Sequence, residues 1–183
     1  MKNYLTITAI FLTCMYANAQ KGKFTVSAGT TGNAMARAIT QNDLTVKKSS
    51  VPIHLEAGYF LTKKLQFTLA FNLSSATSED SIIGYSMKCD GKATSFMLRT
   101  NFFYVSKEKF QLGSGLALGL VKTNFGFSIE PDFPELLIED ESGFGIHLNL
   151  LEARYFFTKN VGIYGNVGYQ DQGLWGLGVI GKF

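Results

Sequence analysis

Residues 65–73, LQFTLAFNL, constrain the fold of this chain more than any other stretch. Every odd position from Leu65 to Leu73 holds a large apolar side chain, and the even positions hold Gln, Thr, Ala and Asn. Successive side chains of a β-strand point to opposite faces, so this strict period of two predicts a strand with one apolar and one polar face. One strand does not decide whether the apolar face turns inward onto a second sheet or outward to lipid.

The same alternation recurs along the chain. It predicts eight strands, in the segments 23–29, 53–59, 65–73, 95–104, 110–120, 144–157, 161–170 and 173–183. Within 144–157 the apolar phase changes, which predicts a β-bulge near Leu151, because one extra residue flips the alternation. After residue 19 no apolar run is long enough for a membrane-spanning helix.

Small residues indicate which face of these strands is inside. The face without the large apolar side chains is rich in glycine and alanine: Gly113, Gly115, Ala117, Gly119, Gly162, Gly168, Gly176 and Gly178. Glycine only weakens a strand that faces water, whereas inside a narrow barrel it makes room for a few large polar side chains. We therefore expect the apolar face to point outward to lipid. A sandwich with Leu and Phe inside is the alternative.

The connections between the segments alternate in length. Short joins with a common pattern, YFLTKKL, FYVSKEKF and YFFTKNV, centre on Thr62, Ser106 and Thr158, whereas the joins at about 31–50, 75–91 and 121–142 are long. Short periplasmic turns and longer extracellular loops are typical of outer-membrane barrels. The sequence therefore predicts an all-β fold, an eight-stranded antiparallel up-and-down transmembrane β-barrel.

The amino terminus has the features of a secretory signal peptide. Lys2 precedes an apolar run that is too short to span a membrane, and Ala17-Asn18-Ala19 forms a cleavage site. We expect a signal peptide at residues 1–19 and a barrel domain at residues 20–183. Lipoprotein processing at Cys14 is the less favoured alternative, because Thr13 is a poor residue before a lipidated cysteine.

The expected mature chain has little net charge and one cysteine. Without Lys2, sixteen basic residues face fourteen acidic ones, which suggests no nucleic-acid partner. Cys89 is the only cysteine after residue 19, so no intramolecular disulfide is expected.

Aromatic residues gather near the ends of the predicted strands. Interfacial rings favour the two edges of a bilayer, so we expect an aromatic belt: Tyr59, Phe102, Tyr104, Phe110, Tyr155, Phe157 and Trp175. The last segment alternates and ends on Phe183. A last strand of this kind resembles the signal by which outer-membrane barrels are recognised for assembly.

Residues 20–183 resemble the OmpA/OmpX-type family of small outer-membrane barrels, in the form common among Bacteroidetes. The resemblance rests on the strand number, the turn pattern and the terminal Phe183. It implies an outer-membrane location, contact with outer-membrane lipid and recognition of the last strand by the barrel-assembly machinery. We expect a monomer.

Several ionisable side chains are predicted to face the lumen: His54, Glu56, Arg99, His147, Glu152, Arg154 and Lys182. Opposite charges in so narrow a lumen pair with one another, so we expect ion pairs that close it. Similarity to OmpA-type barrels implies a second possibility, in which Glu56 and Glu152 exchange partners among Arg99, Arg154 and Lys182 to open a narrow path. The sequence does not rank these partners.

No catalytic or metal site is expected. His54 and His147 are the only histidines, and no third ligand is evident at their height, so we interpret them as polar fillers without metal or cofactor. A lipid A deacylase of the barrel type needs a His and a Ser that face lipid, whereas His147 is predicted to face inward and position 149 is Asn. We therefore do not expect an enzyme.

The third long join is strongly acidic. Residues 128–143 hold six of the fourteen acidic residues: Glu130, Asp132, Glu135, Glu139, Asp140 and Glu141. This segment could bind a cation or a basic partner, or simply be a solvated loop. The expected function is structural and surface-interacting, through the long loops. A narrow channel for small solutes and a soluble periplasmic barrel that binds an apolar ligand are the alternatives.

Overall fold

The computed structural model describes residues 22–33, 36, 39–40, 45–82, 85–130, 133–170 and 173–183. The predicted signal peptide at 1–19 and its cleavage site lie outside these residues. No helix within them is both long and apolar enough to cross a membrane.

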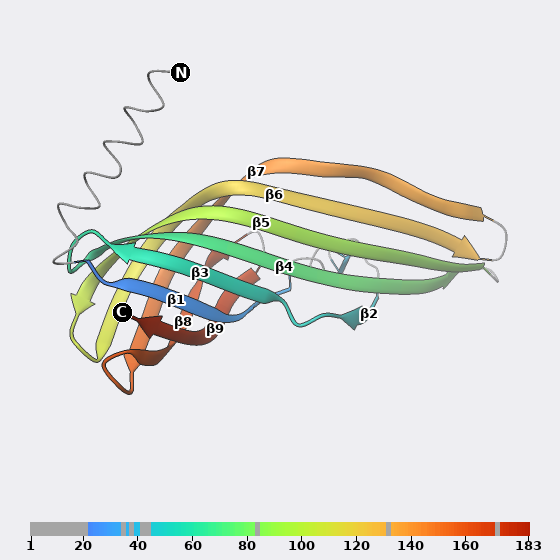
Figure 1. The fold of residues 1–183 in the computed structure, drawn as a ribbon. Helices are drawn as coiled ribbons and strands as arrows, with labels where there is room; N and C mark the ends of the chain where they lie inside the picture. Colours follow the sequence, from blue (N-terminus) through green and yellow to red (C-terminus); the bar gives the residue numbers. More distant parts are fainter. Residues whose placement is uncertain are drawn as a thin grey trace, which may run out of the picture.

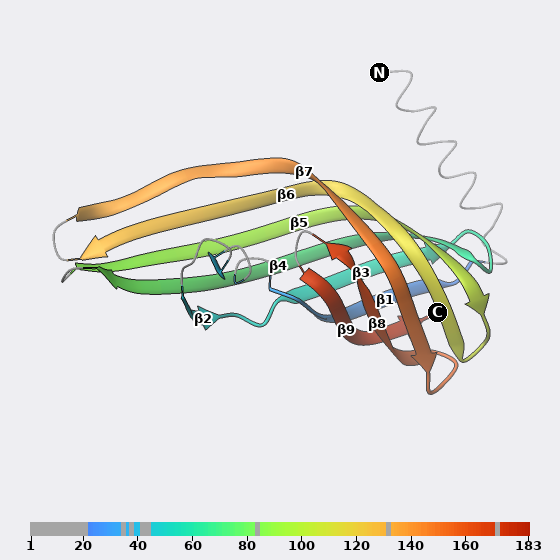
Figure 2. The same ribbon diagram turned by 180° about the vertical axis from the view of Figure 1, so that it is seen from behind.

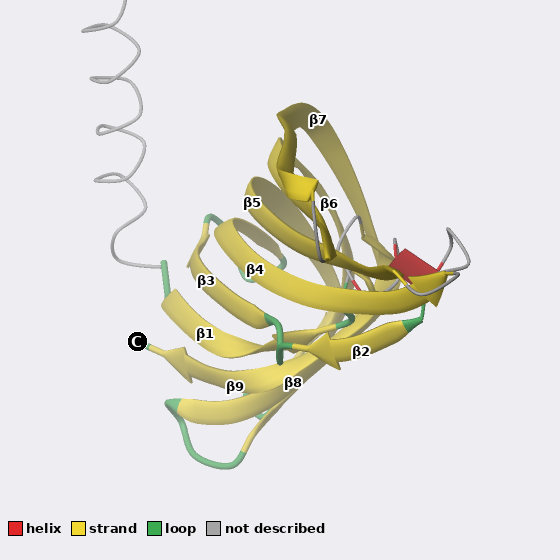
Figure 3. Ribbon diagram, turned by 90° about the vertical axis from the view of Figure 1, so that its right-hand side faces the viewer, coloured by secondary structure: helices red, strands yellow, loops and turns green. Residues whose placement is uncertain are grey.

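The described chain is almost entirely β-strand. The strands are β1 (Phe24–Thr31), β2 (Val46–Ser49), β3 (Ile53–Phe60), β4 (Leu65–Ile82), β5 (Tyr85–Ser106), β6 (Phe110–Glu130), β7 (Phe133–Phe156), β8 (Val161–Gln170) and β9 (Gly173–Lys182). Their order in the sheet is β2-β4-β3-β1-β9-β8-β7-β6-β5, and β5 also pairs with β4. Eight antiparallel strands therefore form a closed barrel, as predicted, and the short β2 lies beside it (Figures 1 and 3).

The barrel closes between the two ends of the described chain. β1 pairs with both β3 and β9. At the end of this pairing, the backbone N–H of Phe24 donates to the carbonyl oxygen of Phe183 at 3.0 Å, and the N–H of Phe183 donates to the carbonyl oxygen of Phe24 at 2.8 Å. Closure removes the free strand edges that an open sheet would present.

The strands of the barrel differ greatly in length. β1, β3, β8 and β9 have 8 to 10 residues, whereas β4 to β7 have 18 to 24. The four long strands continue past the ends of the short ones as a sheet, and β2 pairs with β4 at one edge of it (Figures 1 and 2). We call this sheet the extension; it comprises residues 74–82, 85–93, 123–130 and 133–141.

The extension replaces two of the predicted long loops. Residues 75–91 and 121–142 were expected to be loop, but β4 and β5 stay paired from Ser74↔Ala93 to Ile82↔Tyr85, and β6 and β7 stay paired as far as Ile129↔Phe133. An antiparallel ladder satisfies the backbone N–H and C=O groups of each added residue, so the hairpins continue even where the apolar alternation ends. The remaining long join, 31–50, contains β2.

The loop between β1 and β3 covers the base of the extension. Ile39, Ala76 and Ala93 form a small buried cluster, and Val46 and Phe125 pack against it. This cluster joins three strands of the extension to the segment around β2, so the base of the extension has an apolar core of its own.

The barrel wall has the two predicted faces. Leu69, Leu98 and Leu118 point outward, with 48%, 53% and 41% of their surface exposed, whereas Gln66, Asn72 and Arg99 are buried inside. The predicted bulge is also present, because the pairing of β7 with β8 shifts register between Asn149 and Leu151. The prediction that the apolar face is the outer one is therefore confirmed.

Glycines on the inner wall lie directly across from large lumen side chains. Gly113 pairs with Phe103, Gly162 with Phe156, and Gly178 with Tyr164. A Cβ at Gly113 would lie 2.8 Å from Cδ1 of the Phe103 ring, and one at Gly178 would lie 2.6 Å from Cε1 of Tyr164. Each of these large side chains thus extends over the glycine of the neighbouring strand. The narrow lumen has room for the large side chain because the glycine has none.

Candidate functional site: the lumen

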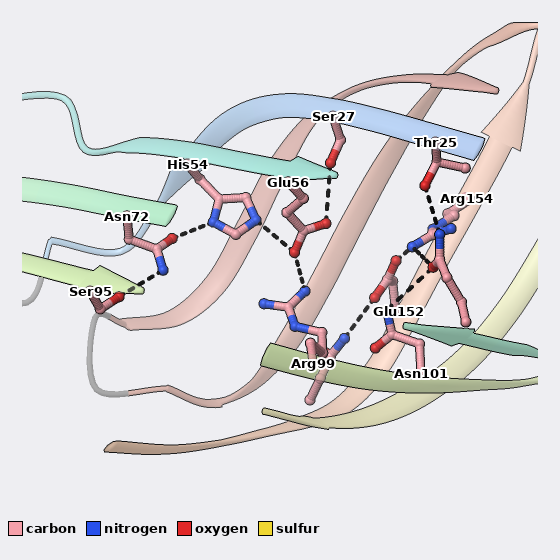
Figure 4. A network of polar contacts seen from close by, with 12 residues as sticks. Thr25, Ser27, His54, Glu56, Asn72, Ser95, Arg99, Asn101, Glu152 and Arg154 are labelled. Atoms are coloured by element: carbon pink, nitrogen blue, oxygen red, sulfur yellow. Dashed lines mark hydrogen bonds and ion pairs between the residues drawn. The ribbon is translucent and has the colours of Figure 1, made fainter. Parts of the chain in front are cut away.

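The first cluster in the lumen is built around Glu56. Because Ser27, His54 and Glu56 occupy inward positions on the adjacent strands β1 and β3, their side chains meet. Glu56 Oε2 accepts from the Ser27 hydroxyl at 3.1 Å, and its Oε1 lies 2.9 Å from Nε2 of His54. Nη1 of Arg99, on β5, forms an ion pair with the same Oε1 (Figure 4).

His54 continues this cluster along the sheet. Its Nδ1 contacts Oδ1 of Asn72, on β4, and the Asn72 amide donates from Nδ2 to the Ser95 hydroxyl at 2.9 Å (Figure 4). Both ring nitrogens of His54 therefore face an oxygen. These contacts fix the imidazole as a link between strands.

The second cluster is built around Glu152 and Arg154 on β7. These side chains share the inward face two residues apart, and Arg154 Nε donates to Glu152 Oε1 at 2.5 Å. Arg154 Nη2 donates to Gln66 Oε1 at 2.8 Å, and Gln66 Nε2 donates to the Thr25 hydroxyl at 2.6 Å. Asn149 supplies a further amide donor to Glu152 at 2.8 Å.

The two clusters together balance their charges. Glu56 is paired with Arg99 and Glu152 with Arg154, and all four side chains are buried. A buried ion is tolerated where its partner and further hydrogen bonds replace water. The sequence did not determine the partner of either carboxylate. In the structure each carboxylate pairs with an arginine, and neither pairs with Lys182.

Lys182 lies apart from these ion pairs, and His147 faces the lumen from β7. Lys182 Nζ donates to the backbone carbonyl of Glu108 at 3.2 Å and lies 4.0 Å from the centre of the Phe156 ring, near the short turns. The buried His147 pairs in register with Ala117 of β6. Among the described residues, no group of three His, Cys, Asp or Glu side chains is arranged to hold a metal ion.

Three buried phenylalanines lie between the ion pairs and the short turns. Phe60, Phe103 and Phe156 come from β3, β5 and β7, and the rings of Phe60 and Phe103 are 5.6 Å apart. The Arg154 guanidinium lies 4.5 Å from the centre of the Phe103 ring. We call these three side chains the phenylalanine layer. Its apolar rings occupy the lumen where an ion path would have to pass.

Sequence reasoning missed the phenylalanine layer, although a signal was present. Each short turn follows adjacent aromatic residues: Tyr59-Phe60, Phe102-Phe103-Tyr104 and Tyr155-Phe156-Phe157. Neighbouring residues of a strand face opposite sides, so one aromatic of each group must point into the lumen.

The side chains predicted to form the aromatic belt are outside the barrel. Phe102, Tyr104, Phe110, Tyr155, Phe157 and Trp175 are exposed, and Tyr59 is half-buried. Tyr59 packs against Phe24 at a ring distance of 5.8 Å, and Tyr155 packs edge-on against Phe157 at 5.5 Å. Phe183, the predicted assembly signal, is also exposed on the outside.

Comparison with known proteins agrees with this architecture. No protein-family model and no curated protein matches the sequence. Ail, the attachment invasion locus protein of Yersinia pestis, solved with the heparin analogue sucrose octasulfate, is 17% identical with a TM-score of 0.56, covering 89% of this chain and 99% of Ail. A major outer membrane protein from Thermus thermophilus is 14% identical with a TM-score of 0.53, covering 88% of this chain and 99% of that protein. The shared fold is the closed barrel of small outer-membrane proteins.

Proposed function

We propose that this chain is an integral outer-membrane barrel without enzymatic activity. The observation that carries this proposal is the outer surface of the barrel, where large apolar side chains stand exposed on every strand of the ring. Soluble monomers rarely expose apolar patches above a few hundred Å², so a surface of this kind needs lipid as its solvent. The resemblance to the form common among Bacteroidetes, the export signal at 1–19 and the monomeric state stay predictions.

The proposed role is to present the extension above the membrane to a partner. Among the described residues, the part of β7 before Leu148 pairs only with β6, so one edge of the extension has unpaired backbone groups. Such an edge accepts an additional strand. Because residues 128–143 carry six acidic side chains and no Lys or Arg, we propose that the partner contributes an extended basic segment.

Two other functions are less well supported. The phenylalanine layer argues against a channel that opens by exchange of ion-pair partners, since the exchange would leave the rings in place. Binding of a sulfated polymer, suggested by the ligand of Ail, does not suit the acidic 128–143 segment because like charges repel.

Cysteine labelling in intact cells tests the location and the orientation together. In a Cys89→Ser background, Lys88→Cys places a thiol on the extension and the matched Lys159→Cys places one on the turn between β7 and β8; both native side chains are exposed. A membrane-impermeant maleimide should label only the first variant in whole cells and both after lysis. Labelling of Lys159→Cys alone in whole cells would reverse the orientation, and labelling of neither would contradict surface exposure.

Binding of a basic strand is tested with peptides. A peptide of alternating Lys and Val should bind the purified barrel, and one of alternating Glu and Val should not. Glu139→Lys/Glu141→Lys should weaken this binding, whereas Glu79→Lys, on β4, should leave it unchanged. Equal binding of both peptides would contradict an acidic edge as the recognition element.

A further inference from the structure

A second site lies at the short-turn end of the barrel. A cavity of about 800 Å³ opens there, lined by the segment before β1, the turns at 61–63 and 106–108, and inward residues of β6 and β9. Its lining includes Lys23, Lys63, Lys107 and Lys182, with Glu108 as the one acidic side chain. We call this cavity the lysine vestibule. It lies on the turn side of Phe60, away from the ion pairs, and none of the functions considered above uses it.

The whole short-turn end is strongly basic. Apart from the ion pairs of the lumen, its described residues include Glu108 and seven lysines: Lys23, Lys63, Lys64, Lys107, Lys109, Lys159 and Lys182. The extension, by contrast, holds most of the acidic residues. Lysines gathered around a concave, partly enclosed space create a positive potential that attracts anions more strongly than a flat surface with the same charge.

Among the described residues, Lys182 forms no ion pair with a carboxylate. It is 4% exposed, and among the described residues its ammonium has one hydrogen-bond acceptor, the carbonyl oxygen of Glu108. A buried ammonium needs a counter-charge and acceptors for its three N–H groups. An anion in the vestibule would supply both.

Gln111 adds a second unsatisfied group to the same cavity. Its side chain is 6% exposed and lines the vestibule, and its Oε1 has no hydrogen-bond partner within the described part of the chain. A hydroxyl group can satisfy this acceptor. The vestibule thus combines several ammonium donors with one buried acceptor, which suits a phosphate group that carries both charged oxygens and a P–OH.

We propose that the lysine vestibule binds a phosphate group, held by Lys182 from the wall and by Lys63 and Lys107 from the turns. A soluble phosphate and the headgroup of a phospholipid share the charged oxygens that the lysines would bind. The hydroxyl that satisfies Gln111 would be a P–OH in a soluble phosphate and a glycerol hydroxyl in a headgroup such as phosphatidylglycerol, whose phosphodiester has no P–OH. If the barrel is oriented as proposed above, the vestibule faces the periplasm. Binding itself does not depend on that orientation, so the two proposals can fail separately.

Paired lysine variants test the site. In zwitterionic detergent micelles at low salt, pyrophosphate should bind saturably, as measured by calorimetry. Lys63→Gln/Lys107→Gln removes two lining charges, and the matched control Lys64→Gln/Lys109→Gln removes two charges from the same turns without touching the cavity. We expect at least roughly tenfold weaker binding in the lining variant and a change of less than about threefold in the control.

Three results would overturn the proposal. The first is that pyrophosphate does not bind the wild type saturably, and the second is that both double variants weaken binding equally. The third is that Lys182→Gln binds as tightly as the wild type while a heat-modifiable gel band shows that the variant is folded. Equal weakening in both double variants would mean that the short-turn end attracts anions by its total charge and not by a site in the vestibule. The four turn lysines are exposed, so the double variants should fold.

A comparison of two lipid compositions distinguishes a lipid headgroup from a soluble phosphate as the bound group. The pyrophosphate titration is repeated in nanodiscs of phosphatidylcholine and in nanodiscs with phosphatidylglycerol. Weaker apparent binding with phosphatidylglycerol, abolished in the lining variant, would identify a lipid headgroup as the competing occupant. Equal binding in the two bilayers would show that the phosphatidylglycerol headgroup does not compete, and would favour a soluble phosphate as the occupant.

Discussion

Among the described residues, Arg99 forms an ion pair with one carboxylate. Its side chain is 1% exposed, and its ion-pair partner is Glu56, which also meets Ser27 and His54. At this scale the lumen is a set of matched pairs, so removing one member has a different effect from removing both.

Arg99→Ala should destabilise the barrel by about 3–5 kcal/mol, because it leaves Glu56 buried without its cation. Lys47→Ala, which removes the exposed pair of Lys47 with Glu79, should cost less than about 1 kcal/mol. Urea unfolding in micelles measures both changes. The double variant Glu56→Ala/Arg99→Ala should recover part of the loss; if it is less stable than Arg99→Ala alone, the unpaired charge is not the cause.

Cys89 provides a pH-dependent observable in the extension. Burial raises the pKa of the Cys89 thiol, and the neighbouring Asp90 carboxylate raises the same pKa further. The thiolate is the reactive form, so alkylation by iodoacetamide should stay slow at pH 8 and accelerate only above the ordinary thiol pKa of about 8.5.

The matched comparison is Cys89→Ser/Lys88→Cys, whose thiol occupies an exposed position one residue away. Its alkylation rate should rise at lower pH than that of Cys89. Because the folded-state pKa of Cys89 is raised, the stability contributed by the neutral thiol is present below the unfolded pKa and is lost as the pH rises through the folded pKa. Identical pH profiles for the two variants would contradict burial of Cys89.

At the scale of strands, glycines and large side chains form complementary pairs across neighbouring strands. Gly178→Ala would bring a Cβ to 2.6 Å from Cε1 of Tyr164 and to 2.7 Å from Cα of Gly29, so the strand or the ring must move. We expect a loss of about 1–3 kcal/mol in the free energy of unfolding.

Gly143→Ala is the matched control for this overpacking. A Cβ at Gly143 has no atom within 4 Å, so its variant should keep the wild-type urea midpoint or exceed it slightly. Equal losses in both variants would indicate that backbone conformation, rather than space in the lumen, requires these glycines.

The strands were predictable to the extent that they contact two different solvents. Between Leu65 and Leu73 one face is the exposed outer surface of the barrel and the other faces the lumen, so the period of two is strict. Beyond Ser74 the strands belong to the extension and no longer enclose the lumen, so the alternation weakens. Sequence reasoning therefore predicted loops where β4 and β5 remain paired as strands. The phase change near Leu151 was predictable because the flanking segments 144–150 and 153–157 lie within the regular part.

The lumen was predictable in composition but not in pairing. Inward positions follow from the alternation, which placed Glu56, Arg99, Glu152 and Arg154 inside. Their partners depend on strand register and on side-chain reach across the lumen, which a single sequence does not specify. For Lys182 the alternation gave the correct face, but its height along the barrel, at the level of the short turns, separates it from both carboxylates.

At the scale of the whole molecule, the barrel should not conduct ions. The phenylalanine layer lies across the lumen below two neutralised ion pairs, so planar-bilayer recordings of the wild type should show no steady conductance. Phe103→Ala/Phe156→Ala removes two of its rings and should give measurable conductance.

The matched control removes two phenylalanines that are exposed on the outside of the barrel. Phe102→Ala/Phe157→Ala deletes the same atoms from neighbouring positions outside the barrel and should remain closed. Conductance in the wild type, or in the outward variant as well, would mean that leakage does not pass through the layer.

The unequal strand lengths make the two sides of the barrel differ in height. Seen from the end of the extension, the long strands β4 to β7 lie on one side of the barrel, and the short strands β8, β9, β1 and β3 lie on the other (Figure 3). If the barrel lies in a membrane as proposed, a neighbouring protein contacts either the long strands or the short ones, depending on how the barrel is rotated about its own axis. The access of a partner to the extension would then depend on this rotation, whereas a barrel of uniform height would present the same surface in every direction.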